Sequence, residues 1–297
     1  MLEKGTHITH KEVPLQPLER EALSRRDVLK IGAATGAGYA VAASPILAQA
    51  IRTDAQGLVA QDIKLKSGSD TIPAYEARPA ASGKYPVLVV ISEIWGVHEY
   101  VKDVCRRFAK EGYYAVAPEM FSREGGVAHL KDVQEILKIV LNIPRKQILQ
   151  DLSTAADHAR RQPGARADRM GVTGFCWGGS TTIQFAAHYK DTGAAVVWYS
   201  PLGRAYKDDP PKTGFDVAQD IRCPLLGLFG EEDQNPSPVD VRRFEELLKM
   251  HNRNVEIVIY PKAGHAFHAD YRPNYRPEAA KDAWTRCLAW FQKYLKA

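Results

Sequence analysis

The sequence predicts an α/β protein: a single, mostly parallel, doubly wound sheet that carries helices on both of its faces. Three observations support this prediction. Short apolar runs alternate with amphipathic, helix-length segments throughout residues 51–297. Several of these runs are apolar at every position, as strands buried on both faces of a parallel sheet are. No linker interrupts the alternation, so we expect one domain with right-handed crossovers.

The first half of this region predicts three strands and three helices. Strands are expected where short apolar or extended runs end at a turn or a proline, at 71–77, 85–91 and 113–117. Helices are expected where apolar residues recur every three or four positions, at 97–111, 127–140 and 148–161. Pro163 and Gly164 end the last of them.

The second half continues the alternation. Buried strands are expected at 170–175, 194–199, 224–229 and 255–260, and helices at 177–189, from Ser237 onward and at 278–295. Ser237 is a good capping residue, Pro238 suits the first helical position, and Asp240 completes a capping box. The chain therefore predicts that parallel strands bring their carboxyl ends, and the loops that follow them, to one edge of the sheet.

One of these loops has the pattern of a nucleophile elbow. The segment Gly174-Phe175-Cys176-Trp177-Gly178-Gly179 stands between a predicted strand and a predicted helix, and its glycines remove side chains that would clash in so sharp a turn. The N-terminus of the following helix favours an anion at the tip. Cys176 occupies the position where most such elbows carry serine. The alternative is a buried cysteine in a glycine-rich turn.

Two further residues follow strands at the same edge. Asp233 lies in a loop after 224–229, and His265 lies in a loop after 255–260. The order nucleophile, acid and histidine fits a triad in which His265 takes the thiol proton and Asp233 fixes the imidazole tautomer. Glu231 and Glu232 compete for the role of the acid. Taken singly, Asp233 could be a loop cap and His265 a turn histidine.

The loop after the strand at 85–91 is Ser92-Glu93-Ile94-Trp95-Gly96. In folds with this elbow, such a loop and the residue after the nucleophile supply the backbone N–H groups of an oxyanion hole. These groups would belong to Ile94 and Trp177, and Glu93 would point toward Cys176. The alternative for Glu93 is a solvated loop glutamate.

These motifs, together with Ala263-Gly264-His265-Ala266-Phe267, resemble the dienelactone hydrolase family over nearly all of residues 51–297. The resemblance implies one α/β-hydrolase domain that cleaves an unsaturated lactone or another carboxylic ester through an acyl-enzyme. It also implies a thiol that rests neutral until Glu93 moves on substrate binding. Cys176, Asp233, His265 and Glu93 match the family's catalytic positions.

The chain departs from the family at one substrate contact. Where the family has an arginine four residues after the histidine, this chain has Ala269. Arg272 could replace it if the loop after His265 folds back, and Trp95 is expected to contact substrate as well. Candidates for a second arginine are Arg123 and Arg145. With Ala269 in place, we expect neutral esters to be cleaved at least as well as carboxylate-bearing ones.

Residues 1–50 are predicted to be a targeting segment outside the fold. Arg25 and Arg26 precede an uncharged, Ala- and Gly-rich stretch that ends in the small-x-small motif Ala48-Gln49-Ala50. The arginine pair resembles a twin-arginine (Tat) signal. We expect cleavage near Ala50, export by the Tat machinery, and a periplasmic or secreted domain at 51–297. Residues 31–50 would make a poor membrane anchor because they hold several glycines and a proline.

Composition and spacing weigh against other classes. The net charge is +5, and the basic residues gather in no face or tail, which argues against nucleic acid as a partner. Cysteines 105, 223 and 287 are expected in the core. We expect a small-molecule ester or lactone as the partner of a monomer that needs no metal or cofactor.

Three other hypotheses remain for the site. The first is a catalytically silent binding protein with this fold, against which the complete set of Cys176, Asp233, His265 and Glu93 argues. The second is a metal site at His265, His268 and Asp270, for which no further ligands are evident. The third is a redox role for Cys176, although no resolving cysteine lies nearby in the sequence.

Overall fold

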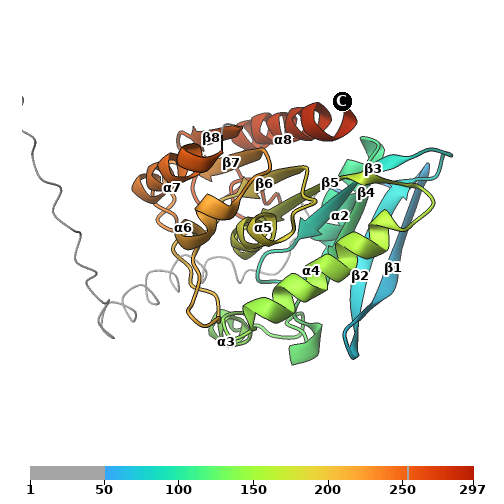
Figure 1. Cartoon of the computed structure of the whole chain (residues 1–297), viewed down its shortest axis with the longest axis horizontal. Helices are drawn as coiled ribbons and strands as arrows, with labels where there is room; N and C mark the ends of the chain where they lie inside the picture. The colour runs from blue at the N-terminus through green and yellow to red at the C-terminus, as the bar shows by residue number, and fades with distance from the viewer. Residues whose placement is uncertain (1–50, 253) are drawn as a thin grey trace, which may run out of the picture.

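Eight strands form one sheet in the computed structural model, which describes residues 51–252 and 254–297 (Figure 1). Their order across the sheet is β1-β2-β4-β3-β5-β6-β7-β8. The strands are β1 (Leu58–Ser67), β2 (Asp70–Pro79), β3 (Tyr85–Ile91), β4 (Tyr114–Pro118), β5 (Ala165–Phe175), β6 (Ala194–Trp198), β7 (Leu225–Gly230) and β8 (Val255–Tyr260). The pairs from β4 to β8 are parallel, whereas β2 pairs antiparallel with β1 and β4. The predicted leader at 1–50 lies outside the described residues.

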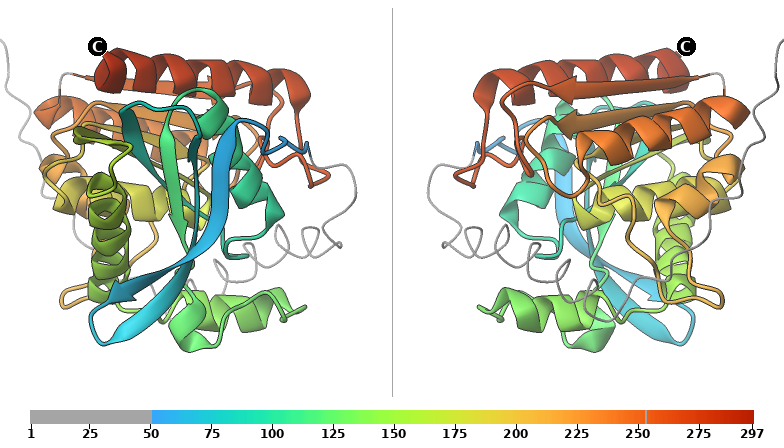
Figure 2. Two further views of the ribbon diagram at one scale, coloured as in Figure 1. Left: turned by 90° about the vertical axis from the view of Figure 1, so that its right-hand side faces the viewer. Right: turned by 90° about the vertical axis from the view of Figure 1, so that its left-hand side faces the viewer.

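Helices cover both faces of this sheet (Figure 2). They are α2 (Glu99–Lys110), α3 (Val133–Val140), α4 (Arg145–Arg160), α5 (Trp177–His188), α6 (Gly214–Val217), α7 (Pro238–His251) and α8 (Pro277–Phe291), with short helical turns η2 (Ser122–Glu124), η3 (Ala218–Asp220) and η4 (Gln292–Lys296). On one face α2 meets α8, where the ring of Phe108 lies 4.6 Å from that of Trp284. Helices α4 and α5 pack on strands β3 and β5 and on each other. Helix α7 packs on β7, β8 and α6. The predicted fold class is confirmed.

Most predicted elements agree with the structure to within a few residues. Two differ for physical reasons. The helix expected at 127–140 is shorter, because Asp132 caps α3 by accepting a hydrogen bond from the Gln134 N–H. Strand β1 was not predicted, because its side chains are mostly exposed or half-buried and it lacks a continuous apolar run. The predicted capping box of Ser237 and Asp240 is confirmed at the start of α7.

The buried strands place the site. In β3, all residues from Pro86 to Ile91 are buried, and β5 is buried from Met170 to its end at Phe175. The two strands lie side by side in parallel, with Ile91 paired to Gly174. The loop after β3 therefore begins beside the turn that carries Cys176. Within the described part of the chain, every helix is too short or too polar to cross a bilayer.

Candidate active site

Cys176 is the single residue between β5 and α5. Its backbone has a φ of 54° and a ψ of −116°, a conformation that residues with side chains rarely adopt. Its N–H donates to the Trp198 carbonyl oxygen at 3.0 Å, which fixes the turn to β6. The side chain is almost fully buried at the N-terminus of a helix whose residues are nearly all buried. The structure thus has the strained strand-to-helix turn that the sequence predicted.

The glycines of this turn are required by close contacts. A Cβ atom at Gly174 would lie 2.2 Å from the Gly178 carbonyl oxygen. One at Gly178 would lie 2.4 Å from the carbonyl oxygens of both Ile91 and Ser92. No side chain fits at either distance, so the absence of side chains lets the elbow touch the loop after β3.

His265 and Asp233 meet from two different loops. The Nδ1 atom of His265 lies 2.8 Å from Asp233 Oδ2, and the second carboxylate oxygen accepts a hydrogen bond from the Asn235 N–H at 2.9 Å. Burial alone lowers the pKa of His265, but the Asp233 carboxylate and the Cys176 side chain outweigh burial and hold it well above its ordinary value. Asp233 is buried, whereas Glu231 and Glu232 are exposed, so Asp233 is the acid that contacts the histidine.

Glu93 is fully buried and does not lie on a solvated loop surface. Its Oε2 atom accepts a hydrogen bond from the Tyr271 hydroxyl and lies 3.5 Å from Arg272 Nη2. Its Oε1 atom accepts no hydrogen bond from the described residues. A buried carboxylate with one unsatisfied oxygen is costly unless function or a ligand requires it, which favours a role at the site.

The loop after His265 folds back, so that Arg272 becomes buried beside Glu93. Its guanidinium carbon lies 5.2 Å from the centre of the Trp95 ring. Burial alone lowers the pKa of Arg272, and the Glu93 carboxylate more than offsets this, so that the guanidinium stays charged. The structure therefore brings Arg272 and Trp95 together, while Ala269 is buried with no polar group to offer.

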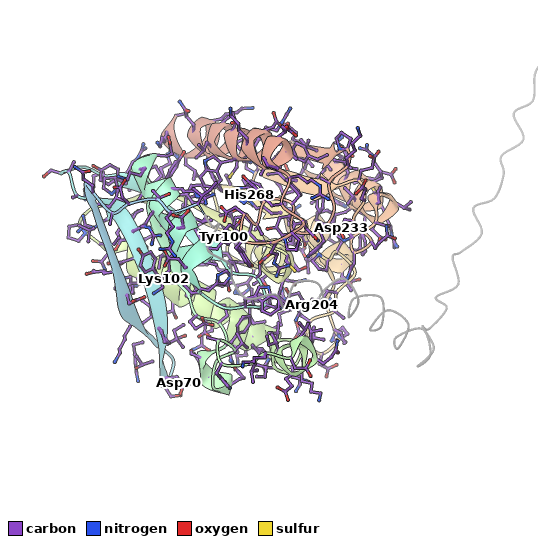
Figure 3. The ribbon with its side chains drawn as sticks, turned by 180° about the vertical axis from the view of Figure 1, so that it is seen from behind. Asp70, Tyr100, Lys102, Arg204, Asp233 and His268 are labelled. Carbon is purple, nitrogen blue, oxygen red and sulfur yellow. The ribbon has the colours of Figure 1, made fainter. Side chains whose placement is uncertain are left out.

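Arg123 does not join this cluster. Its guanidinium pairs with Asp70 and Asp151, each at 2.5 Å, and donates to the Ser67 carbonyl oxygen. These partners belong to the β1–β2 hairpin and to α4, and Figure 3 shows Asp70 far from Asp233. Two carboxylates already compensate the charge of Arg123, so the geometry gives no support to the expectation that it binds substrate. Arg145 likewise contacts Gln184 and Asp208.

The two proposed oxyanion donors lie on adjoining segments. Trp177 is the first residue of α5, where backbone N–H groups have no acceptor within the helix. Ile94 is buried in the loop that touches Gly178 through Ser92.

The sequence did not predict two residues that contact the candidate active site, Tyr271 and Arg204. The Tyr271 hydroxyl binds Glu93, and the Arg204 guanidinium lies 5.5 Å from the Trp177 ring. Both stand in irregular loops whose path no local pattern predicts. Figure 3 places Arg204 and Asp233 on the same side of the molecule.

The residues of the alternative metal site have other partners. His268 Nδ1 lies 2.5 Å from the Tyr100 hydroxyl, and Asp270 pairs with Arg107 at 2.6 Å. Figure 3 shows His268 next to Tyr100. Among the described residues no group of three suitable side chains could hold a metal ion.

The other three cysteines are core residues, as expected. Cys105, Cys223 and Cys287 are buried, and none of the four cysteines forms a disulfide. Burial raises the pKa of all three thiols, to about 12 for Cys223, so they stay protonated near neutral pH.

Comparisons with known proteins identify the family of the chain. Residues 72–295 match the model of the Dienelactone hydrolase family. A protein of Methylorubrum extorquens named "Putative carboxymethylenebutenolidase" is 44% identical over 274 residues, which cover 92% of this chain and 94% of that protein. A protein of Bradyrhizobium named "Probable 2-oxo-3-(5-oxofuran-2-ylidene)propanoate lactonase" is 31% identical, over 75% of this chain and 89% of its own length.

A solved structure extends the likeness to three dimensions. The crystal structure of a "Putative Dienelactone Hydrolase" from Klebsiella pneumoniae is 43% identical and superposes with a TM-score of 0.76, over 80% of this chain and 99% of that one. The family model covers most of the chain, and this chain covers 89 to 99% of the length of these three relatives. The chain therefore belongs to the dienelactone hydrolase family and is a hydrolase of the ester and lactone class.

Proposed function

We propose that the chain hydrolyses a carboxylic ester or lactone through a covalent intermediate on Cys176. The observation that carries the proposal is the contact between His265 Nδ1 and Asp233, because it holds the proton on Nδ1 and leaves Nε2 as the base. The Cys176 side chain also raises the pKa of His265, which supports a hydrogen bond between the two groups.

The proposed reaction has two halves. His265 Nε2 takes the thiol proton, and the sulfur of Cys176 attacks the carbonyl carbon. The carbon–oxygen bond of the ester then breaks, and the leaving oxygen takes the proton from His265. In the second half His265 takes a proton from water, the hydroxide attacks the thioester, and the carboxylic acid leaves as the thiol is restored. For a lactone, both products are parts of one opened molecule.

Backbone donors would stabilise the oxyanion of each half. The N–H groups of Ile94 and Trp177 lie on segments that the elbow glycines press together. Each such donor contributes about 3 to 4 kcal/mol of transition-state stabilisation in comparable sites. The charge on the carbonyl oxygen grows only in the transition state, so these donors would act on the rate rather than on binding.

Glu93 and Arg272 would recognise the substrate. The loop after His265 folds back and brings Arg272 beside Glu93. This favours Arg272 as the residue that binds a substrate carboxylate, a contact that Ala269 cannot make. Because Glu93 now shares that guanidinium, a substrate carboxylate competes with Glu93 for it. Glu93 would then move toward Cys176 and help to form the thiolate. This proposal replaces the expectation that neutral esters are cleaved at least as well as carboxylate-bearing ones.

The test uses p-nitrophenyl acetate. Cys176→Ala should lower the hydrolysis rate to background while the far-UV spectrum stays unchanged, and Cys176→Ser should keep only weak activity. Cys223→Ala is the matched control, because that thiol is buried in the core and should not affect turnover. A thiol-alkylating reagent should abolish the activity of both the native chain and the control. Undiminished turnover by Cys176→Ala would exclude covalent catalysis at this residue, and no turnover by any form would favour a silent binding protein.

We also propose that the chain is exported by the Tat machinery to the periplasm or beyond and acts there as a monomer. The support is the arginine pair at 25 and 26 and the cleavage motif at 48–50. Replacing both arginines by lysine should keep the uncleaved chain in the cytoplasm, as measured by cell fractionation. Normal export of that double variant would point to the general secretory route.

A further inference from the structure

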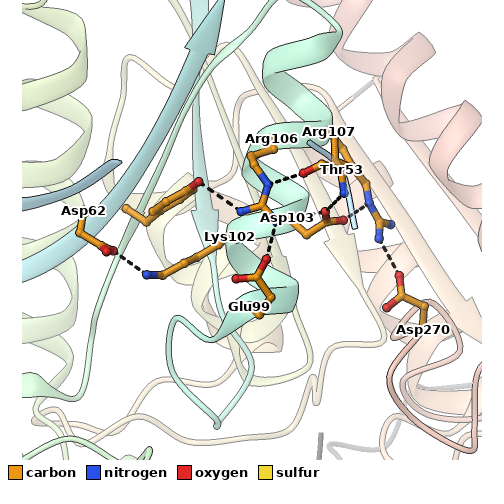
Figure 4. A network of polar contacts seen from close by, with 9 residues as sticks. Thr53, Asp62, Glu99, Lys102, Asp103, Arg106, Arg107 and Asp270 are labelled. Carbon is orange, nitrogen blue, oxygen red and sulfur yellow. Dashed lines mark hydrogen bonds and ion pairs between the residues drawn. The ribbon is translucent and has the colours of Figure 1, made fainter. Parts of the chain in front are cut away.

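The segment 51–54 begins the described part of the chain, and its Thr53 lies against α2, beside Asp103 and Arg106 (Figure 4). The segment is held mainly by its backbone. The Thr53 N–H donates to Asp103 Oδ1, and the Thr53 carbonyl oxygen accepts from Arg106 Nε at 2.7 Å. Asp54 adds an ion pair with Lys110 at 2.7 Å. The first residues that the structure describes are thus fixed to one helix.

Arg107 connects this segment to the candidate active site. Its Nε atom lies 2.5 Å from Asp103 Oδ2, and its Nη2 atom lies 2.6 Å from Asp270 Oδ2 (Figure 4). Both carboxylates are almost fully buried. Asp270 directly precedes Tyr271 and Arg272, the two residues that contact Glu93. Polar contacts therefore connect residue 53 to Asp270, and the next two residues of the chain are the partners of Glu93.

The charges of this network do not balance. It contains three carboxylates and two guanidinium groups, those of Glu99, Asp103, Asp270, Arg106 and Arg107. The described side chains of the network therefore carry a net charge of −1. Burial raises the pKa of Asp270, and Arg107 offsets this only in part. The network lacks one positive charge, and a buried carboxylate is the group that most needs it.

The nitrogen of Ile51 is in position to supply that charge. Its backbone N–H approaches the Asp270 carboxylate and lowers the pKa of that group. Even so, Asp270 Oδ1 is buried and accepts no hydrogen bond of normal geometry from the described residues. An amide nitrogen offers one proton and no charge, whereas an ammonium group offers three protons and a full positive charge.

We propose that Asp270 is a binding site for the α-ammonium group of Ile51, which forms when the leader is cut after Ala50. Hydrolysis of the Ala50–Ile51 peptide bond by a leader-processing protease consumes one water. It leaves a carboxylate on Ala50 and an ammonium on Ile51. The new ion pair neutralises the network and anchors the loop that carries Tyr271 and Arg272. The inference depends on the cleavage position predicted from the sequence, and its effect on catalysis rests on the proposed function.

Three chains with different N-termini test this site. One begins at Ile51, released from a fusion by a protease that leaves no extra residue, and one begins at Ala50. The third is the full chain of 297 residues. All described strands and helices lie within the shortest chain. The chain that begins at Ile51 should have a Tm at least about 3 °C above that of the chain with one more residue. Its α-ammonium, observed by NMR, should have a pKa above the ordinary value of about 8.

A pair of substitutions identifies the partner. In the chain that begins at Ile51, Asp270→Asn should remove both the Tm advantage and the raised pKa of the ammonium. Asp62→Asn is the control, because its ion pair with Lys102 joins the same helix but lies at the exposed surface. Equal Tm values for the chains that begin at Ile51 and Ala50, with an ordinary pKa for the ammonium, would overturn the proposal. A higher Tm for the chain that begins at Ile51 than for the one that begins at Ala50 would support this site. If none of the chains then hydrolysed an ester, the proposed function would be overturned and this site would stand.

Discussion

At the scale of single residues, the site depends on which charges are already compensated. Arg272 and Arg123 are both arginines with carboxylate partners. Arg272 has the Glu93 oxygen at 3.5 Å beside the elbow, whereas Arg123 has two close partners at the hairpin. A weak, shared ion pair can exchange for a substrate carboxylate more readily than a doubly paired one. This difference supports the proposal that Arg272, and not Arg123, binds a substrate carboxylate.

We expect Arg272→Ala to change substrate choice. The native chain should prefer a carboxylate-bearing lactone over its neutral methyl ester, since a hydrogen bond to a charged group contributes about 1.5 to 3 kcal/mol. The ratio of kcat/KM for this matched pair should fall about tenfold or more in Arg272→Ala. Arg123→Ala should leave the ratio unchanged. A ratio near one in the native chain would restore the expectation drawn from Ala269.

Glu93→Gln should alter the pH dependence of acylation. The amide keeps the size of the side chain and can accept from the Tyr271 hydroxyl, but it cannot carry the negative charge that helps to form a thiolate. We expect slower release of p-nitrophenol in the first turnover and a shifted pH–rate profile, both measured by stopped flow. Tyr271→Phe removes the hydroxyl partner of the same carboxylate and should shift the profile too. A profile identical to that of the native chain would assign Glu93 a structural role.

The sequence predicted the residues of the site better than their contacts. Cys176, Asp233, His265 and Glu93 follow strands of a parallel sheet, so topology alone places them at one edge. The partners of Glu93 could not be predicted, because Tyr271 and Arg272 lie in a loop whose course depends on long-range contacts. The partners of Arg123 could not be predicted for the same reason, since Asp70 and Asp151 are distant from it in sequence.

At the scale of elements, the elbow depends on backbone contact between β5, α5 and the loop after β3. Gly178→Ala should lower the free energy of unfolding by about 3 kcal/mol, because its Cβ would overlap two carbonyl oxygens that cannot easily move. Urea unfolding measures this change. Gly203→Ala is the control, because its Cβ would meet the Phe215 ring at an ordinary 3.7 Å. Equal urea midpoints of unfolding for Gly178→Ala and Gly203→Ala would show that the backbone around the elbow can move to accommodate the added Cβ.

Elements that are buried on two faces were the easiest to predict. Strand β3 agrees with the predicted bounds, and β6 agrees to within one residue, because a run of apolar residues must be covered on both sides. Strand β1 packs against one neighbour at the sheet edge, so its sequence carries a weaker pattern. The four-residue helix α6 was also missed, although Thr213 and Asp216 form a capping box there.

At the scale of the whole molecule, two buried histidines make stability depend on pH. Burial lowers the pKa of His268 to about 3 and that of His98 to about 4. The unfolded chain takes up protons at these positions below about pH 6.5, whereas the folded chain does not. Their contribution to stability is therefore fully present above about pH 6.5 and is lost as the pH falls toward 4 and then 3.

His268→Gln should reduce this dependence. Without His268 the chain takes up one proton fewer on unfolding, so the slope of unfolding free energy between pH 4 and 6 should fall by up to about 1.4 kcal/mol per pH unit. Urea unfolding across that range measures the slope, and the exposed His251 provides a matched control as His251→Gln. Parallel curves for the native chain and His268→Gln would contradict the assignment.

All four thiols are buried, and the raised pKa values of three of them have a practical consequence. An electrophile that reacts with thiolates meets protonated sulfur at positions 105, 223 and 287. Covalent labelling should therefore stop at one probe molecule per chain, on Cys176. The mass of the labelled protein would count competent active sites directly in a crude preparation, with no cysteine removed and no substrate known.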